Sequence, residues 1–574
     1  MKKELKGVGK MRTKNWLSML MVLLMAISLV ACGSTQKPGT EINDIVQSSS
    51  DTESPGVASS GLPITPEKTT ISAFIMQMPT GMIDVKTNTF TTEMEEMTNV
   101  HLDMVVAPND GAKEKLNLLL ASDDYPEIIL GGLFNNAELV KYGTEEKILI
   151  PLNDLIDKYA INLKERWSEH PSYKNDMTSL DGNIYGIPAA DSGTTGHGAA
   201  SMKLWMNMDW LEKLGLDMPV TTEDFHSVLK AFKTQDPNGN NKQDEIPLTG
   251  AINTWNADPY LFLLNAFDYY DNGTLLKLKD GKVSFCANTD GFKQGLKYIA
   301  TLYNEGLIDP AAFTQNEQQL SAIGNNEGVA IAGAAAAGHL GMFVGVNNIE
   351  RCKQYDNIFP LQGPNGYMGT PYAKDVRLSG AQFVITDKCK RPDVAIRWAD
   401  LFCSEEITVR SQIGIKGKQW DDADPGTVGM DGVTPATRKY LTFETSGEVA
   451  KTNDTWGWTM RLIEPNWKAT FQVEGDIYDP TNYEARLYRA TIKLLPYAAD
   501  VDQMPSFWMN NDDSSKINQI FTPLNDYVKT SIVEFITGKK DVDKDWDTYI
   551  SGLSKLNYEE YVRLYQTAYD ALVK

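Results

Sequence analysis

Long apolar runs and basic residues are both scarce in this chain of 574 residues. From residue 69 to 574 no stretch is long and apolar enough to cross a bilayer, which argues against a protein with several membrane spans. There are 54 Lys and Arg against 76 Asp and Glu, so the formal charge is -22. Because nucleic acids and other polyanions require basic patches, we expect no nucleic-acid partner.

Familiar catalytic motifs are missing as well. The sequence contains no GxSxG nucleophile elbow and no GKS or GKT phosphate loop. Its five histidines form no metal-binding pair at helical spacing; they are His101, His170, His197, His226 and His339. We therefore expect a protein that is not an enzyme.

Cysteine is rare, with five residues in the whole chain. Apart from Cys32 they are Cys286, Cys352, Cys389 and Cys403. Four cysteines spread this widely through so large a chain do not form the framework typical of disulfide-stabilised proteins. We expect them to be buried thiols.

What is present begins with a processing signal. A basic leader, MKKELKGVGKMRTKNW, precedes the apolar run LSMLMVLLMAISLVA, which is short for a membrane span. Residues 1–31 are therefore predicted to be a signal peptide rather than a membrane anchor or a buried helix. The tetrapeptide from Leu29 to Cys32 resembles a bacterial lipobox, in which the cysteine thiol receives a diacylglycerol. Without the leader, which carries six Lys or Arg and one Glu, the formal charge is -27.

The segment 32–68, which follows the cleavage site, is rich in Ser, Thr, Gly and Pro. It has too little apolar surface to offset its ordering entropy, so we expect a flexible tether. As a coil, residues 33–68 would span roughly 30 to 35 Å. The expected location is the extracellular face of the cell membrane, held by lipid at Cys32.

The remainder, residues 69–574, exceeds what one hydrophobic core supports, so at least two lobes are expected. Strand-like and helical patterns alternate over 69–76, 89–100, 101–107, 111–124 and 125–132. That alternation is typical of a mostly parallel sheet flanked by helices. Further on, 221–234 is predicted to be a helix with Thr222 as its N-cap, and Trp210 and Trp398 are expected to pack in the core.

The Gly- and Ala-rich stretch 328–338 leaves two interpretations open. Small residues permit close approach of the backbone to another group, or they form a tightly packed helix. The pattern slightly favours packing.

The loop DPNGNNKQDEIPL, residues 236–248, has oxygen-bearing groups at the spacing of a calcium loop. The ligand set expected from this spacing is Asp236, Asn238, Asn240, the carbonyl of Lys242, Asp244 and Glu245. An EF-hand loop has Gly at its sixth position and Glu at its twelfth, where this chain has Asn241 and Pro247. The alternative is an Asx-type turn between a helix and a strand.

Several motifs together resemble the extracellular solute-binding lipoproteins of carbohydrate ABC importers, in particular the long alginate- and oligosaccharide-binding members. They are the lipobox, DGNIYGIP, WMNMDWLEKLGL, the loop at 236–248, GIKGKQW and the Tyr-rich C-terminal helix. The resemblance implies a two-lobed periplasmic-binding-protein-like fold of type II, with a mostly parallel sheet in each lobe and the ligand between the lobes. The implied boundaries are about 69–188 plus 360–465 for the N-lobe and 189–359 plus 466–574 for the C-lobe.

The same resemblance implies a structural Ca²⁺ in the loop and a monomer that delivers sugar to ABC permease subunits. Sugar rings are held by aromatic faces and planar polar side chains. The predicted ligand-binding residues, taken from loops and element ends, are Gln77, Tyr185, Asp191, Trp255, Trp420, Trp456 and Trp458. For each aromatic the alternative is a partly buried loop residue.

Two other functions remain open from the residues alone. A secreted, calcium-stabilised glycoside hydrolase needs only two carboxylates on either side of one bond, and the chain has many. A peptide-binding or adhesive lipoprotein is a further alternative, which the abundance of Trp disfavours.

Overall fold

The structure is a computed structural model, and the description below is limited to the residues it places with certainty. These are 57, 60–77, 82–109, 111–190, 197–252, 254–371, 378–442, 452–457, 459–463, 467–498, 504–505 and 508–573. The predicted signal peptide and Cys32 lie outside them. In the described part of the chain, no helix has the length and apolar character needed to cross a membrane.

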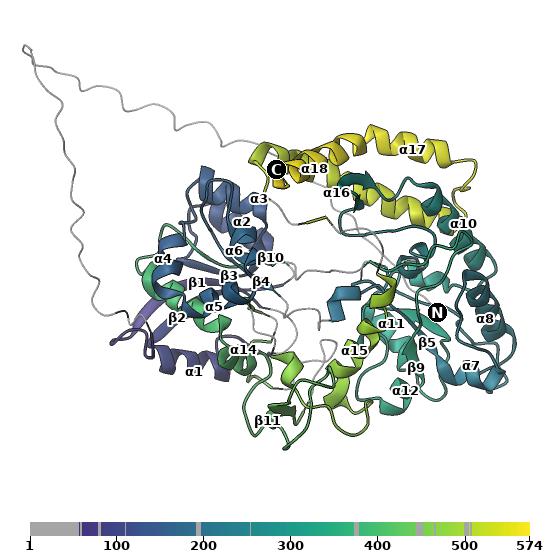
Figure 1. Ribbon diagram of the computed structural model, residues 1–574, viewed down its shortest axis with the longest axis horizontal. Coiled ribbons are helices and arrows are strands. Elements are labelled where there is room, and N and C mark those ends of the chain that lie inside the picture. Colours follow the sequence, from purple (N-terminus) through teal and green to yellow (C-terminus); the bar gives the residue numbers. More distant parts are fainter. Residues whose placement is uncertain are drawn as a thin grey trace, which may run out of the picture. The chain divides into compact units, whose positions relative to one another are not determined.

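The first sheet has five strands in the order β2-β1-β3-β10-β4 (Figure 1). The strands are β1 (Thr69–Gln77), β2 (Val100–Pro108), β3 (Ile128–Phe134), β4 (Ile187–Ala190) and β10 (Leu378–Ile385). β1 runs parallel to β2 and to β3, whereas β10 is antiparallel to β3 and β4. The strand and helix alternation predicted for 69–132 is therefore confirmed.

Helices accompany this sheet, and their buried apolar residues belong to the same hydrophobic cores as the strands. They are α1 (Thr89–Thr98), α2 (Ala112–Ala121), α3 (Asn136–Leu139), α4 (Asn153–Tyr159), α5 (Ile161–Glu169), α6 (Ser172–Met177), α13 (Pro392–Asp400) and α14 (Glu405–Gln412). In α1, the Asn88 side chain accepts a hydrogen bond from the Phe90 N–H, and Phe90 and Met94 are buried. Trp398 of α13 is buried, as predicted.

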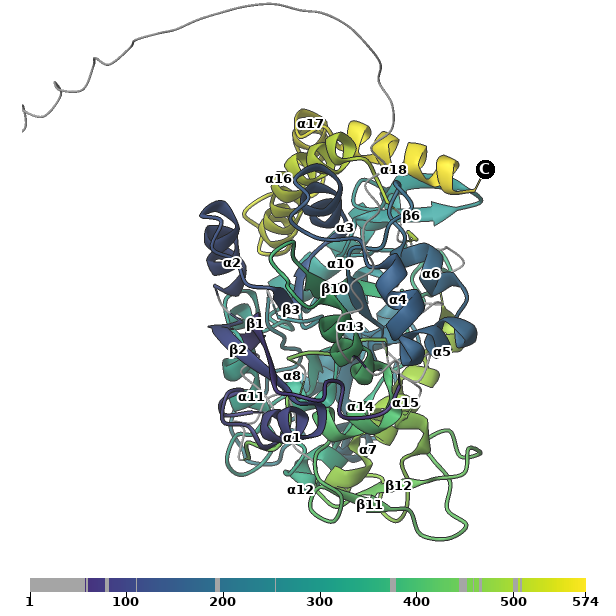
Figure 2. The same ribbon diagram turned by 90° about the vertical axis from the view of Figure 1, so that its left-hand side faces the viewer.

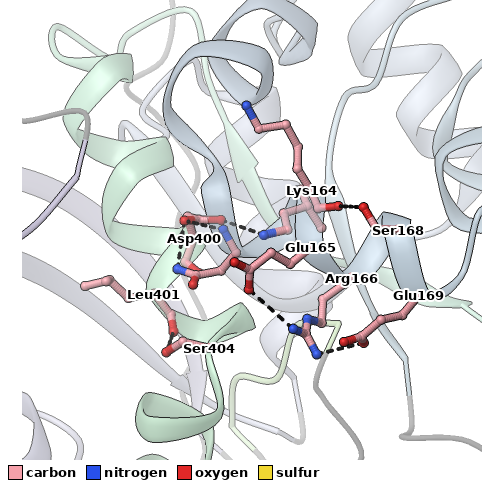
Figure 3. Close-up of polar contacts among 10 residues, drawn as sticks. Lys164, Glu165, Arg166, Ser168, Glu169, Asp400, Leu401 and Ser404 are labelled. Atoms are coloured by element: carbon pink, nitrogen blue, oxygen red, sulfur yellow. Dashed lines mark hydrogen bonds and ion pairs between the residues drawn. The ribbon is translucent and has the colours of Figure 1, made fainter.

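A buried carboxylate joins two of these helices (Figure 3). The Asp400 Oδ1 accepts a hydrogen bond from the backbone N–H of Leu163 at 2.8 Å, and its Oδ2 accepts one from the N–H of Asn162 at 3.1 Å. These N–H groups open α5 and have no partner within the helix. The C-terminal end of α13 therefore caps α5.

Residues 60–68 belong to the folded body. The tether predicted over 32–68 therefore ends earlier than residue 68. The side chain of Ile64 is fully buried, and its backbone N–H donates to the Thr98 carbonyl at 3.1 Å. The guanidinium of Arg397 donates to the Gly61 carbonyl at 3.2 Å. The apolar surface of Ile64, within a polar stretch, gives the segment enough burial to pack.

A second sheet has the order β8-β5-β9, from β5 (Leu204–Asn207), β8 (Ala334–Ala336) and β9 (Tyr355–Asn357). β5 is antiparallel to both neighbours, whereas the bridges Ile246↔Ala332 and Thr249↔Ala335 at the β8 segment are parallel, so the sheet in this part is mixed rather than mostly parallel. These strands have three or four residues and are joined by long connections. Strands this short give too little sequence pattern to predict their direction. The path of the connections between them decides it. Of the Gly- and Ala-rich stretch, residues 334–336 form strand β8, so the packed-helix interpretation fails there.

The elements around the second sheet include a group of three C-terminal helices, α16 (Asn511–Ile536), α17 (Trp546–Lys555) and α18 (Tyr558–Leu572), which lie together in both views (Figure 2). The others are α7 (Met208–Leu214), α8 (Thr222–Thr234), α9 (Leu261–Leu264), α10 (Asp290–Asn304), α11 (Glu317–Gly324), α12 (Ile349–Lys353), α15 (Tyr483–Ile492), β6 (Leu276–Lys279), β7 (Lys282–Phe285), β11 (Trp420–Asp422) and β12 (Arg438–Tyr440). The N-cap of α8 is Thr221, one residue before the predicted Thr222. Its hydroxyl accepts a hydrogen bond from the Asp224 N–H, and the Asp224 carboxylate accepts one from the Thr221 N–H.

The hydrophobic residues gather in separate cores. One core contains residues from 64–190 and 383–463, and another contains residues from 202–361 and 504–564. A third core, from 205–355 and 483–490, lies around the second sheet. The predicted lobe boundaries stay a prediction, because membership of a core does not set where one lobe ends. Cys286, Cys352 and Cys403 are buried, as expected, whereas Cys389 is half-buried.

Candidate functional site

The indole of Trp255 lies at the protein surface and is held in place by contacts with Gly338 and His339. The side chain is 46% exposed, the largest exposure among the predicted ligand-binding aromatics that the structure describes. Its ring covers Gly338 so closely that a Cβ there would lie 2.2 Å from the indole. His339 lies beside it, with ring centroids 6.1 Å apart, and the His339 Nδ1 is 2.8 Å from the Tyr483 hydroxyl. A glycine at 338 therefore permits the close backbone approach that the sequence left open.

An uncharged cavity of about 390 Å³ is lined by residues from α3, α16 and α18 and the loops near them. Its polar lining consists of Asn135, Asn136, Thr274, Ser514, Asn518 and Tyr565, and its apolar lining includes Met504 and Met509. Amides and hydroxyls both donate and accept hydrogen bonds. The sequence analysis missed these residues because neutral amides are common throughout the chain and carry no spacing signal.

Trp420 lies in a different and larger cavity, which encloses about 1000 Å³. The lining residues come from α1, α14, the loop after α14 and the β11–β12 pair. The indole Nε1 donates to the Gly414 carbonyl at 3.0 Å, which fixes the orientation of the ring. The Trp420 side chain is half-buried.

Two predicted ligand-binding residues have structural roles instead. Tyr185 is buried, its ring packs against Gly143, and its hydroxyl donates to the Asp181 carboxylate at 2.6 Å. Burial, and after it the hydrogen bond to that carboxylate, raise the pKa of the Tyr185 hydroxyl. The Gln77 amide donates to the Ile83 carbonyl at 3.2 Å and accepts from the Val85 N–H at 3.1 Å, so it closes the loop after β1.

Trp456 also departs from the prediction. Its side chain is 1% exposed and packs edge-on against Phe90, with centroids 5.6 Å apart, and beside Phe402 at 5.7 Å. The polar sequence around it suggested an exposed ring, but helices α1 and α13 supply an apolar pocket. Trp458 and Asp191 lie outside the described residues.

The loop at 236–245 folds as a series of tight turns around its own side chains. The Asp236 carboxylate accepts from the N–H groups of Gly239, Asn240 and Asn241 at 3.0 to 3.1 Å. Asn241 has φ 58°, so the sixth position adopts the left-handed backbone that Asn tolerates in place of Gly. The amides of Asn238 and Asn240 converge on the Asp244 carboxylate, which lowers the pKa of Asp244.

Glu245 is the unsatisfied member of this loop. Among the described residues, nothing donates a hydrogen bond to its buried Oε1. Burial raises the pKa of Glu245, and the negative charges of Asp236 and Asp244 raise it further. No cluster of three or more His, Cys, Asp or Glu with metal-binding geometry occurs in the described part of the chain. The donor set is nevertheless all oxygen, as a hard cation requires, and an orphaned carboxylate oxygen fits such a group.

Comparison with known proteins gives a consistent result. Residues 85–408 match the family of bacterial extracellular solute-binding proteins. The fructooligosaccharide ABC transporter substrate-binding protein FusA of Streptococcus pneumoniae serotype 4 is 30% identical over 569 residues, which cover 98% of both chains.

Solved structures of the same relative also match this fold. FusA in complex with kestose has a TM-score of 0.71 at 28% identity, and an EF-hand mutant of FusA with fructo-nystose has 0.72 at 27%. Each match covers 88% of this chain and 99% of the other. The predicted two-lobed solute-binding fold is thereby confirmed, and the chain belongs to the family of bacterial extracellular solute-binding proteins.

Proposed function

We propose that this protein is the substrate-binding component of an ABC importer and captures a neutral oligosaccharide. The observation that carries the proposal is the uncharged cavity at α3, α16 and α18, together with the supported, exposed indole of Trp255. The named substrate of the relative FusA, a fructooligosaccharide, agrees with this class of ligand.

The chemistry of the cavity favours sugar over a charged solute. No Asp, Glu, Lys or Arg lines it. A buried ion would lack a counter-charge there, whereas sugar hydroxyls exchange hydrogen bonds with amides and hydroxyls. The apolar C–H face of a pyranose or furanose ring suits an indole surface such as that of Trp255.

Capture by closure follows from the arrangement of the cores along the chain. Successive segments alternate between the 64–190 core and the cores that begin near residue 202. We place the two lobes at 69–188 plus 360–465 and 189–359 plus 466–574, so that sugar contacts from both lobes stabilise the closed form. Closure is then what the permease subunits recognise.

Attachment to the membrane is part of the same proposal. The lipobox sequence supports lipidation of Cys32, such as by diacylglycerol and palmitate, and the family is extracellular. Because Val57 and residues 60–68 pack onto the body, the free chain between lipid and body is shorter than 33–68. The protein acts as a monomer on the outer face of the cell membrane.

Calcium is proposed as a structural ion in the 236–245 loop. The orphaned Oε1 of Glu245 and the neighbouring carboxylates of Asp236 and Asp244 support it. Asn238, Asn240 and the Lys242 carbonyl would complete the oxygen set. A bound Ca²⁺ would offset the mutual repulsion of the three carboxylates, and FusA carries an EF-hand.

Calorimetric titration with a panel of neutral oligosaccharides, beginning with kestose, tests the proposal. Binding is expected, and Trp255→Ala should weaken it by about 1 to 3 kcal/mol. Leu118→Ala, at another exposed apolar side chain, is the control. Release of shortened products from the panel would instead establish the hydrolase, and equal affinities of Trp255→Ala and wild type would remove Trp255 from the site.

A further inference from the structure

The Trp420 cavity shares no lining residue with the cavity at α3, α16 and α18. All of its lining residues lie in 90–97 and 405–438. The second sheet and the three C-terminal helices contribute nothing to these walls. A ligand held here would therefore contact only α1, α14 and the β11–β12 region.

Two arginines in its wall have donors that the protein does not use. Arg410 pairs with Glu93, Nε to Oε2 at 2.7 Å, and Arg438 pairs with Glu405. Their side chains are only 17% and 18% exposed. Within the described residues, the buried Arg410 Nη2 and Arg438 Nε have no acceptor. Such atoms indicate missing hydrogen-bond partners.

An aromatic surface lies among these donors. The Arg438 Cζ is 5.6 Å and the Lys416 Nζ 5.7 Å from the centroid of the Trp420 ring. Arg410 lies over the Phe90 ring at 5.4 Å. Cations are attracted to the face of an aromatic ring, so these contacts hold the charged side chains against the aromatic lining of the cavity.

The charges of the lining restrict the ligand. Four glutamates and three cationic side chains line the cavity, and they are Glu93, Glu96, Glu405, Glu406, Arg410, Lys416 and Arg438. An anion would meet the carboxylates, and a cation would meet the arginines and lysine. A neutral polyhydroxylated ligand avoids both penalties, since its hydroxyls accept from guanidinium N–H groups and donate to carboxylates.

We propose that this cavity is a second carbohydrate site, which takes a neutral sugar unit with its apolar face on Trp420. The guanidinium groups of Arg410 and Arg438 and the ammonium of Lys416 donate to its hydroxyls, and Glu93 and Glu405 accept from them. Because the walls come from 90–97 and 405–438, binding here needs no closure over a ligand. The site would hold sugar at the surface of the protein independently of the site proposed for transport.

Calorimetric titrations with kestose, maltotriose and cellotriose test this proposal in four proteins: wild type, Trp255→Ala, Trp420→Phe and Arg438→Lys. Arg438→Lys keeps the charge beside Glu405 but removes the planar guanidinium, and Trp420→Phe keeps an aromatic ring in the packing. Thermal melts establish that each variant is folded. Trigalacturonate serves as the anionic probe.

The expected result is a binding event with at least one neutral trisaccharide that persists in Trp255→Ala and weakens on the order of tenfold in both Trp420→Phe and Arg438→Lys. Failure of the transport site is a separate outcome, in which Trp255→Ala and wild type bind the sugar with equal affinity. Absence of any event sensitive to the Trp420 and Arg438 variants would overturn the second site. Tighter binding of trigalacturonate than of the neutral probes at this cavity would overturn its assigned ligand class.

Discussion

The indole Nε1 of Trp456 donates a hydrogen bond to the Thr91 hydroxyl at 2.8 Å, across more than 360 residues of sequence. The Thr91 hydroxyl in turn donates to the Val85 carbonyl at 2.6 Å. A tryptophan in a polar, Gly-containing segment is thus tied to the start of α1. This contact makes Trp456 part of the core that supports the sheet, with its faces covered by protein.

Trp456→Ala should therefore destabilise the fold while leaving sugar affinity unchanged. Removing a buried indole typically costs about 3 to 5 kcal/mol of unfolding free energy. Thr91→Val keeps the packing but loses both hydrogen bonds of the hydroxyl and leaves the buried Trp456 N–H without an acceptor, so a cost of about 1 to 3 kcal/mol is expected. Urea denaturation measures both. Weaker sugar binding by folded Trp456→Ala, at unchanged stability, would contradict this role.

Chelation of calcium should lower the melting temperature. A ligand at a thousandfold its dissociation constant adds about 4 kcal/mol of stability, which EDTA would remove. Asp236→Asn should abolish the response to EDTA. Asp431→Asn is the matched control, since Asp431 also caps a turn, at the Val433 and Thr434 N–H groups, but lies in another loop. Identical melts of wild type with calcium and with EDTA would dismiss the ion.

Lys203 should make stability depend on pH. The side chain is 1% exposed at the start of β5, its ammonium contacts the Ala200 carbonyl, and burial lowers its pKa from 10.5 to about 7. Between these values the unfolded chain binds more protons than the folded one, so this residue's contribution to stability rises with pH from about 7 to 10.5.

Lys203→Met should remove that dependence and be more stable than wild type near pH 7, by a few kcal/mol at about 1.4 kcal/mol per pKa unit. The advantage should shrink as the pH approaches 10. Denaturant titrations at several pH values measure it, with the exposed Lys555→Met as control. Parallel curves for wild type and Lys203→Met would show that Lys203 is charged in the folded protein.

Asp400→Ala should lower stability by about 3 to 5 kcal/mol, because it leaves buried donors of α5 and the buried Arg397 without their carboxylate. The Arg397 Nη1 lies 3.7 Å from the Asp400 Oδ2. Asp400→Asn keeps one oxygen acceptor and should fall between Ala and wild type. Circular dichroism melts provide the comparison. A loss below 1 kcal/mol for the alanine variant would mean that water replaces the carboxylate.

Prediction from sequence succeeded where contacts are local. The helix predicted at 221–234 is confirmed as α8, and the apolar residues at helical spacing in it, Phe225, Val228, Leu229 and Phe232, are buried. The left-handed backbone at Asn241 follows from the spacing of the loop. The predictions failed most often for the aromatic residues, because the exposure of an aromatic side chain depends on which distant segments of the chain pack against it. Trp255 and Trp456 occupy similar polar sequences, yet one is 46% exposed and the other 1%.

The sequence alone determined the family, the order of strands and helices up to residue 134 and the turn at 236–245, since the hydrogen bonds and apolar stripes behind them join residues a few positions apart. Only the tertiary structure decided the strand directions of the second sheet, the burial of Tyr185 and Trp456, and the two cavities. Their walls combine segments hundreds of residues apart, and no local pattern records which of these segments will meet.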